Sequence, residues 1–312
     1  MTYNPVVSAI IPVFNRRTLL KEAVDSVVAQ TYPRIELIIV DDGSDDGASE
    51  DFMQRQDLRF LRLEKTSGKE ASDHATAIPK SPGAEGVSAA RNAGIKAANG
   101  ELIALLDSDD LWKPRKIEEQ VRYFEKNPEA IICQTEEIWI RRGKRVNPKK
   151  IHKKCAGYIF EACLPRCIIS PSAVMFRKLL LDEVGYFDES FPVCEDYELW
   201  LRVCAKYRVG LISEGLTIKR GGHADQLSNQ HSLDYYRIRA LVKLLGSSFL
   251  DELQRKAATE ELKKKCRVYL NGCRKRKNKA SHAEILSLMQ KLPILELQIQ
   301  DPIDERANLV SQ

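Results

Sequence analysis

The sequence predicts an α/β protein, in which a Rossmann-like, doubly wound and mostly parallel sheet is followed by a helical C-terminal extension. Apolar runs at residues 6–14, 35–40 and 101–106 have the length and composition of buried strands. The last two runs end directly in carboxylates, at Asp41-Asp42 and at Asp107-Ser108-Asp109-Asp110. Ligands of open α/β sheets bind beyond the carboxyl ends of the strands, so we expect a binding site at these acidic ends.

The composition is that of a globular protein, with 43% hydrophobic and 30% charged residues among 312. The N-terminus lacks the pattern of a signal peptide, and no apolar run approaches the roughly 20 residues that span a bilayer. We therefore expect a cytoplasmic protein whose 8 cysteines are reduced thiols. None forms a C-x-x-C pair, so structural zinc is not expected, although the spacing of Cys155, Cys163 and Cys167 justifies a metal assay.

The first part of the chain predicts a β-α-β unit and a third strand. A turn at 15–17 leads into an amphipathic helix with Thr18 as its N-cap, and Tyr32-Pro33 ends this helix. A helix between two strands favours parallel pairing with a right-handed crossover. Phe60–Leu63 predicts the third strand. The turn after the first strand has no glycine, which excludes a G-x-G-x-x-G fingerprint, a P-loop and the phosphate loop of a nucleotidyltransferase.

The next segment contains a long connection and two helices. Residues 64–85 are polar, which predicts a long loop of the kind that is functional or disordered. Residues 86–98 predict a helix, and Asn99-Gly100 closes it with glycine in the C-cap position. A further helix is expected to begin at Trp112, with an apolar side that includes Phe124.

The acidic end of the 101–106 strand admits two interpretations. Crowded carboxylates repel one another unless a cation or a donor-rich ligand lies between them. Asp107-x-Asp109 is therefore a candidate site for Mg²⁺ or Mn²⁺, which take oxygen ligands and share them with phosphates. The alternative is a solvated turn, because Asp and Ser are common turn residues.

The second half predicts strands at 130–135 and 137–140, followed by a basic stretch at 141–154. This stretch either faces an anionic acceptor or forms a solvated hairpin. Glu195-Asp196 begins a helix with apolar residues on one side. Acidic residues stabilise a first helical turn by about 0.3–1 kcal/mol, which explains them without a catalytic role; the alternative is that Asp196 is a general base.

The C-terminal part predicts helices at 237–245, 251–269 and 286–297. Basic clusters at 263–267 and 274–277 either bind anionic lipid headgroups at a membrane surface or form a solvated helical face. Nucleic acid is not an expected partner, because this region offers only Tyr269 for stacking. We divide the chain into a domain of residues 1–235 and a basic helical extension of residues 236–312.

Four motifs in this order resemble the family 2 glycosyltransferases, which have the GT-A fold. They are Ile10-Ile11-Pro12-Val13-Phe14-Asn15, Val40-Asp41-Asp42-Gly43-Ser44, Ala89-Ala90-Arg91-Asn92-Ala93-Gly94 and Leu106-Asp107-Ser108-Asp109-Asp110. The segments 168–177, 194–202 and 221–228 resemble later motifs of the same family. The resemblance covers about the first three quarters of the chain.

The resemblance implies roles for individual residues. It assigns nucleotide binding to Pro12, Phe14, Asn15, Asp41, Asp42, Arg91, Asp107 and Ser108. It assigns a divalent metal, Mn²⁺ or Mg²⁺, to Asp109 and His223, and catalysis to Asp196 as general base beside Glu195. A carboxylate at Asp42 or Asp41 suits a nucleobase N–H, because it is an acceptor only. Arg91 either approaches the nucleotide or lies on a helix surface.

The activity that the resemblance implies is inverting, metal-dependent transfer of a single sugar from a nucleotide-sugar to an acceptor hydroxyl. We expect a UDP-sugar donor and a glycan or lipid-linked acceptor in cell-surface glycan or glycolipid synthesis. A processive synthase is disfavoured, because the sequence lacks a Q-x-x-R-W motif. The alternative is a catalytically inactive nucleotide-sugar-binding protein. The basic C-terminal region suggests peripheral contact with the inner face of a membrane, or a homodimer.

Overall fold

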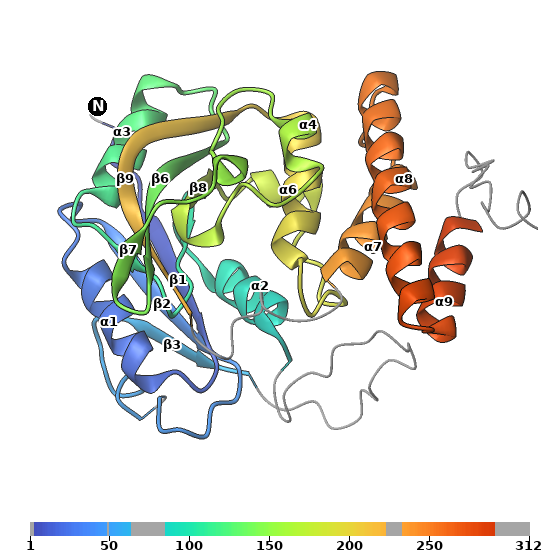
Figure 1. Cartoon of the computed structure of the whole chain (residues 1–312). Helices are drawn as coiled ribbons and strands as arrows, with labels where there is room; N and C mark the ends of the chain where they lie inside the picture. The colour runs from blue at the N-terminus through green and yellow to red at the C-terminus, as the bar shows by residue number, and fades with distance from the viewer. Residues whose placement is uncertain (1–2, 49, 64–84, 223–232, 291–312) are drawn as a thin grey trace, which may run out of the picture.

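The computed structural model describes residues 3–48, 50–63, 85–222 and 233–290 (Figure 1). Within these ranges the strands form a nine-stranded sheet in the order β3-β2-β1-β4-β8-β6-β9-β5, with β7 paired to β6. The strands are β1 (Val7–Val13), β2 (Ile35–Asp41), β3 (Arg59–Arg62), β4 (Leu102–Leu105), β5 (Leu111–Trp112), β6 (Ile132–Arg141), β7 (Lys144–Val146), β8 (Val174–Arg177) and β9 (Val209–Gly221). The main helices are α1 (Arg17–Val28), α2 (Val87–Ala97), α3 (Lys116–Lys126), α4 (Phe160–Cys163), α5 (Leu180–Val184), α6 (Glu195–Lys206), α7 (Leu233–Leu245), α8 (Glu252–Lys275) and α9 (Lys279–Gln290).

The first four strands form the predicted parallel part of the sheet. β1 pairs in parallel with β2 and with β4, so that Val7 lies opposite both Ile35 and Leu102. β3 continues the parallel order beyond β2. β8 runs antiparallel between β4 and β6, which makes the whole sheet mixed. The α/β class and the helical C-terminal region are confirmed, and the parallel strands bring the carboxyl ends of β1, β2 and β4 to one edge.

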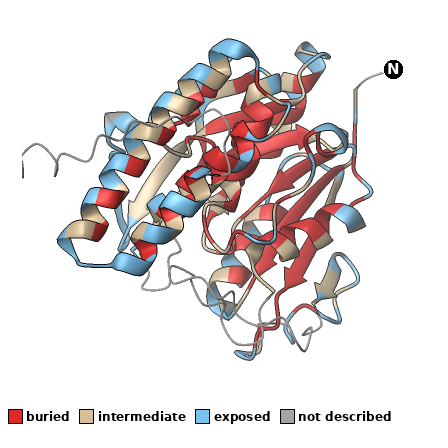
Figure 2. Cartoon of the chain, turned by 90° about the vertical axis from the view of Figure 1, so that its right-hand side faces the viewer, coloured by how far each residue is buried: buried red, intermediate tan, exposed pale blue. Residues whose placement is uncertain are grey.

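Both faces of the sheet are covered, which explains why its central strands are continuous apolar runs. Successive side chains of a strand point to opposite faces. Val7, Ala9 and Ile11 of β1 therefore pack with α1 and α3, whereas Ile10 packs with α2 and α6. Figure 2 shows buried residues along the strands and on the inward sides of the helices.

The start of α1 differs from the prediction. The helix begins at Arg17 rather than after Thr18, and no side chain of its own caps it. The backbone N–H of Arg17 instead donates to the Asp46 carboxylate at 2.8 Å. Asn15 turns the chain with a left-handed φ of 50°, so the helix can start two residues after the turn begins.

Gly100 does not cap α2 as predicted, and instead it lies against the start of β1. α2 ends at Ala97, and the next residue, Ala98, has an extended conformation with ψ 135°. A Cβ at Gly100 would lie 2.7 Å from the backbone N of Ser8 and from the backbone O of Val6. Glycine is therefore required here because β1 approaches the chain closely.

Two further predictions of local structure were wrong. Trp112 belongs to β5, where it pairs with Thr217, and the following helix begins at Lys116. The two strands expected at 130–140 are one strand, β6, whose pairing with β9 is irregular around Glu136. A β-bulge bends a strand without ending it. In the sequence it interrupts the apolar pattern just as a turn between two strands would.

The C-terminal helices pack against the α/β part through α6. Tyr235, Ile238 and Leu241 of α7 belong to the same buried cluster as Trp200 of α6. α8 begins with a capping box between Asp251 and Gln254, and the Gln254 side chain also donates to the Ala205 carbonyl at 2.9 Å. Position 235 lies inside α7, and Figure 1 shows α7, α8 and α9 grouped beside α6.

Parts of the predicted organisation lie outside the described residues. These are residues 64–84 of the expected loop, His223, and residues 291–297 of the last expected helix. Among the helices that the structure does describe, none combines the length and the apolar character needed to cross a bilayer.

Candidate active site

A cavity of about 920 Å³ opens where β1, β2 and β4 end. Most of the residues that the sequence suggested for the site line this cavity. They are Pro12, Phe14, Asn15, Asp42, Arg91, Asp107, Ser108, Asp109, Glu195 and Asp196. Asp41 is not part of the lining, and His223 lies outside the described residues. The carboxyl ends of the strands therefore gather residues from distant segments in one space.

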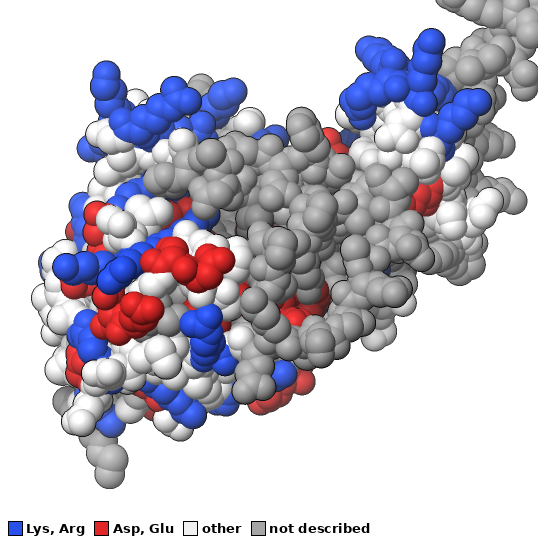
Figure 3. Space-filling view, turned by 90° about the horizontal axis from the view of Figure 1, so that it is seen from below, with Lys and Arg blue, Asp and Glu red and all other residues white. Residues whose placement is uncertain are grey.

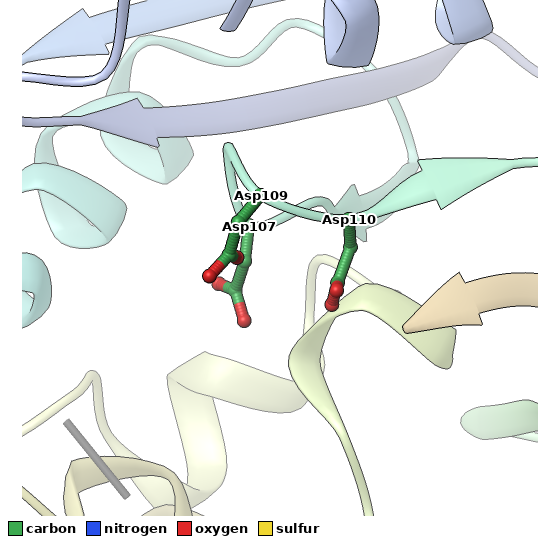
Figure 4. A group of neighbouring side chains, drawn as sticks. All are labelled: Asp107, Asp109 and Asp110. Carbon is green, nitrogen blue, oxygen red and sulfur yellow. The ribbon is translucent and has the colours of Figure 1, made fainter. Parts of the chain in front are cut away.

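The three aspartates after β4 form a compact cluster. One carboxylate oxygen from each of Asp107, Asp109 and Asp110 lies within 4.8 Å of the others. Figure 4 shows that Asp107 and Asp109 project side by side from the turn, whereas Asp110 projects from the segment that leads into β5. Among the described residues, this is the one cluster of three or more side chains suited to holding a metal.

Asp110 is the buried member of the cluster. Its carboxylate accepts hydrogen bonds from the Ser172 hydroxyl at 2.6 Å and from the Arg220 backbone N–H at 2.8 Å. The Ser172 oxygen also accepts from the Asp107 backbone N–H at 3.1 Å, so one serine holds both ends of the acidic turn. Burial, together with the charges of Asp109 and Asp107, raises the pKa of Asp110 to about 7. A cation would relieve this repulsion.

Asp109 is paired with a residue that the sequence analysis left without a role. The Arg16 guanidinium lies 2.8 Å from its carboxylate, and both side chains are largely withdrawn from solvent. Arg16 lines the cavity directly after the predicted nucleotide-binding segment of β1. Its place next to Asn15 was the available signal. A cation that uses the same oxygen of Asp109 must displace Arg16 from it.

Arg91 is buried, so the expected position on a helix surface is wrong. It donates hydrogen bonds of 2.7 Å to Asp107 and to Glu195, and its guanidinium lies 5.2 Å from the centre of the Phe187 ring. Burial opposes its charge, yet Asp107 and Glu195 raise the pKa of Arg91. Although burial disfavours a charged Asp107, the same ion pair lowers the pKa of that carboxyl. Arg91 thus connects the acidic turn to the first turn of α6.

Glu195 and Asp196 occupy the start of α6. Cys194 precedes them with a left-handed φ of 60°, which turns the chain sharply into the helix. Glu195 is buried against Arg91, and burial together with the charge of Asp196 raises its pKa to about 7. Asp196 is half-buried and lines the cavity, so it is the member of this pair that a ligand can reach.

The two aspartates after β2 have separate surroundings. Asp42 lines the cavity, and its two carboxylate oxygens each accept a backbone N–H at 2.8 Å, from Glu85 and from Gly86. Asp41 is fully buried, accepts the Ser44 backbone N–H at 2.9 Å and pairs with Arg62 at 3.1 Å. Of the two positions that the sequence left open for contact with a nucleobase, Asp42 has the access.

Asn15 joins the loops that follow β1 and β2. Its backbone N–H donates to the Ser44 hydroxyl at 2.9 Å, and its side-chain oxygen accepts from the Asp45 backbone N–H at 2.9 Å. Pro12 and Phe14 line the adjacent wall of the cavity. These contacts place an apolar wall and a rigid turn beside Asp42.

Lys219 and Ser172 are two further site residues that were not predicted from the sequence. The Lys219 ammonium lies 3.7 Å from Asp110 and donates to the Ser170 hydroxyl at 3.1 Å. Burial disfavours its charge, but Asp110 and Glu137 raise its pKa. Lys219 lies just before the Gly221-Gly222 pair, and Ser172 lies within the 168–177 motif, so proximity to these motifs was the only signal.

The cluster fits a hard divalent cation. Carboxylate oxygens are the ligands that Mg²⁺ and Mn²⁺ prefer, and three of them converge here. Burial, and then the charges of Asp109 and Asp107, raise the pKa of Asp110, and a bound cation would favour its ionised form. Among the described residues the cysteines form no cluster of three or more possible metal ligands, and the Cys163 sulfur lies 3.7 Å from that of Cys204.

The fold and the site together define a glycosyltransferase of the GT-A type. Staphylococcus aureus TarS (residues 1–349, in complex with UDP) has a TM-score of 0.61 and 19% identity, covering 83% of this chain and 71% of that one. Mannosyltransferase PcManGT from Pyrobaculum calidifontis, in complex with GDP-Man and Mn²⁺, has a TM-score of 0.53 and 17% identity, covering 92% and 86%. At these identities the likeness establishes the fold.

The sequence comparisons define the family. The model described as "Glycosyl transferase family 2" matches residues 8–185. An uncharacterised glycosyltransferase of Rickettsia felis is 32% identical over 259 residues, which cover 80% of this chain and 39% of that protein. Escherichia coli WfaP, named as a UDP-Glc:α-D-GlcNAc-diphosphoundecaprenol β-1,3-glucosyltransferase, is 31% identical over 208 residues, which cover 64% of this chain and 71% of WfaP. The chain belongs to glycosyltransferase family 2, and it spans about two fifths of the length of the Rickettsia felis relative.

Proposed function

We propose that this protein transfers a single sugar, with inversion, from a UDP-sugar to an acceptor hydroxyl in a reaction that requires a divalent cation. The observation that carries the proposal is the presence of Asp196 and the Asp107–Asp110 cluster in one cavity, joined through Arg91 and Glu195. A cluster that can hold a cation and a carboxylate that can accept a proton are the two components that such a transfer needs.

The donor would bind at the ends of β1, β2 and β4. Pro12 and Phe14 supply an apolar wall, and Asp42 has spare acceptor capacity for a base N–H. Asp107 and Ser108 would face the ribose. The UDP complex of TarS, and the UDP-Glc in the name of WfaP, favour uracil as the base, whereas the GDP-Man complex of PcManGT is the competing case.

Asp109, with Asp107 and Asp110, would hold the divalent cation. The bound ion would supply positive charge to the diphosphate of the donor. His223 remains a proposed additional ligand. Arg91 keeps Asp107 ionised, and Ser172 keeps Asp110 directed at the cluster.

In the transfer step Asp196 would accept the proton of the acceptor hydroxyl. The acceptor oxygen forms a bond to the anomeric carbon as the bond from that carbon to the diphosphate oxygen breaks, so the products are the inverted glycoside and UDP. Base catalysis of this kind contributes about 10²–10⁴-fold in rate. Glu195, held by Arg91, would position Asp196 at the first turn of α6.

We also propose that residues 1–235 form the catalytic domain and that residues 236–312 form a basic extension, whose described helices share the core of that domain and do not fold separately. Lys275, Arg276 and Lys277 are exposed at the end of α8. Figure 3 shows Lys and Arg side chains gathered over the helical part of the molecule, on the right of the view. Such a surface suits peripheral contact with anionic lipid and a lipid-linked glycan as acceptor.

Calorimetric titration of UDP and GDP, each with and without Mn²⁺, tests the proposal. We expect UDP binding that requires Mn²⁺ and that is lost in Asp109→Ala. The exposed Asp182→Asn variant controls for the change of charge. A preference for GDP would overturn the choice of donor but not the site, and binding of neither nucleotide to folded protein would overturn the proposed function.

A further inference from the structure

We propose that the acceptor of this enzyme carries a phosphate group, and that Arg141 and Arg166 bind this phosphate inside the cavity. The inference rests on the proposed function and adds the chemical class of the second substrate. Arg141 ends β6, and Arg166 lies in the segment between α4 and β8. Both residues line the same cavity as the acidic cluster.

Arg141 and Arg166 belong to one local group around Trp139. The Arg141 guanidinium lies 5.7 Å from the centre of the Trp139 ring, and the His152 ring lies 5.1 Å from the same ring. Burial, and then the charges of Arg166 and Arg141, lower the pKa of His152. Both guanidiniums therefore contribute positive potential at the imidazole. Trp139 and His152 also line the cavity, so the group presents an aromatic ring between positive charges.

The charge of this group is not balanced by the protein. Lys154 is neutralised, because it lies 3.2 Å from Glu137 and donates to the Gln134 side chain at 3.0 Å. In the described part of the chain, Arg141 and Arg166 form no ion pair with a carboxylate. Two guanidiniums facing one cavity suit an anion with several oxygens, since each can donate a pair of parallel hydrogen bonds to phosphate.

The group comes from β6 and from the segment between α4 and β8, whereas the proposed donor site is formed by the ends of β1, β2 and β4. The carboxylates near the donor are already matched by cations, with Arg16 on Asp109, Arg91 on Asp107 and Lys219 near Asp110. The positive charges of Arg141 and Arg166 are therefore in excess of what the acidic cluster uses. A second anion, separate from the donor diphosphate, accounts for them.

The segment that carries Arg166 passes close to the proposed base through the next residue, Cys167. Burial and the charge of Asp196 raise the pKa of the neighbouring Cys167 thiol, so this segment runs close to Asp196. The Lys265 side chain of α8 donates to the Pro165 carbonyl at 2.8 Å and fixes the segment from behind. A phosphate held by Arg166 would therefore bring an attached hydroxyl to the base.

Glucose 1-phosphate and geranyl phosphate, titrated calorimetrically into protein saturated with UDP and Mg²⁺, test the inference. The first probe represents a soluble phosphorylated glycan, and the second represents a lipid-borne phosphate. We expect at least one of them to bind, and the double variant Arg141→Gln/Arg166→Gln to weaken it by about tenfold or more. Methyl glucoside, which lacks the charge, should bind less well than glucose 1-phosphate.

The matched control is Lys144→Gln/Arg145→Gln. It removes the same charge from exposed positions of the β6–β7 hairpin that do not line the cavity. This control should leave binding of the probe unchanged, and both double variants should keep wild-type UDP affinity and melting temperature. The probe that depends on the two arginines identifies the source of the phosphate.

The two proposals fail in different ways. If neither probe binds to UDP-loaded protein, or if the probe binds equally to wild type and Arg141→Gln/Arg166→Gln, the phosphate subsite is wrong while the donor site stands. If UDP itself does not bind, the proposed function fails. The same titrations without UDP then decide whether the two arginines form an anion site at all.

Discussion

Arg91 and Glu195 form a buried ion pair at 2.7 Å that joins helix α2 to the first turn of α6. The other arm of the same guanidinium reaches Asp107, 2.7 Å away, at the end of β4. Because the Arg91 guanidinium contacts both carboxylates, it fixes the distance between the proposed metal site and the helix turn that carries the proposed base. Arg91 therefore holds the geometry of the site, and its predicted contact with the nucleotide stays a prediction.

Replacing Arg91 should destabilise the protein and separate the two halves of the site. Removing one partner of a buried ion pair costs about 3–5 kcal/mol, because the other charge is left buried and unpaired. We expect Arg91→Gln to lower the free energy of unfolding in urea by an amount of this order. Lys126→Gln, at an exposed position of α3, should have little effect. A loss below about 1 kcal/mol would contradict the bridging role.

Asp196→Asn should abolish transfer without weakening the donor complex. Asparagine keeps the size of the side chain but cannot accept the proton, so kcat should fall by about 10²-fold or more. UDP affinity should stay within about twofold, as measured by calorimetry on the same preparation. Equal loss of both properties would indicate a structural role for Asp196. Asp182→Asn, on the exposed side of α5, should retain wild-type kcat.

Ser172→Ala should lower the metal affinity of the site, because Ser172 orients the aspartates that would hold the metal. The hydroxyl donates to Asp110 and accepts from the Asp107 backbone, so alanine leaves both groups without this partner. Residues that orient metal ligands typically contribute about 10–100-fold to metal affinity. We expect a loss of this size in the Mn²⁺ dissociation constant, read by electron paramagnetic resonance of free Mn²⁺. The exposed Ser190→Ala is the control, and unchanged affinity in Ser172→Ala would remove Ser172 from the site.

Asp110 should make the metal-free protein less stable as the pH rises. Its pKa is about 7 in the folded protein, against an ordinary value of 3.8, so between these values the folded state binds more protons than the unfolded state. Its contribution to stability is therefore fully present below about pH 4 and is lost as the pH rises through about 7, with a slope of at most about 1.4 kcal/mol per pH unit.

Urea unfolding in the presence of a chelator measures this slope. Asp110→Asn should reduce the slope in that range without removing it, because the buried Glu195 also has a pKa of about 7. Mn²⁺ should reduce the slope in the wild type, since metal binding favours the ionised carboxylate of Asp110. The assignment of this titration to Asp110 would be contradicted if the free energy of unfolding had the same pH dependence in the wild type and in Asp110→Asn between about pH 4 and 7.

Gly100→Ala should test the close approach of the chain to β1. The added Cβ would lie 2.7 Å from two backbone atoms at the start of β1, which real Cβ atoms essentially never show, so the strand must shift. Overpacking of this kind costs about 1–3 kcal/mol. Gly246→Ala is the matched control, because its nearest neighbours lie at 3.5 Å. Thermal unfolding of the two variants should separate them by several degrees.

The sequence predicted the site best where the signal is local. A strand ends in carboxylates within a few residues, so the apolar runs alone place Asp42, Asp107 and Asp109 at strand ends. The direction of β8 could not be predicted, because alternation of side chains is the same in parallel and antiparallel strands. The sheet is therefore mixed, although its first four strands behave as expected.

The cations of the site could not be predicted because they come from separate segments. Arg16 and Lys219 reach the carboxylates of the acidic turn, and the Arg220 guanidinium reaches the Asp109 backbone carbonyl, only after β1 and β9 have joined the sheet. Arg91 had a weak signal. It lies on a helix that packs tightly on β1, since a Cβ at Gly94 would lie 2.5 Å from Ile10. A charged residue on such a helix is more easily buried than its type alone suggests.

The packing of α6 means that the proposed base is supported by the far end of the chain. Tyr236 of α7 lies 6.2 Å from Phe191, ring to ring, and Lys243 lies 2.8 Å from Glu198, close to Asp196 on the same helix. Leu262 and Cys266 of α8 continue the same apolar cluster. One core runs from the sheet to α9, so loss of packing in α8 and α9 would also reduce the packing of α6, which carries Asp196. The sheet and these helices should therefore unfold together in a single cooperative transition.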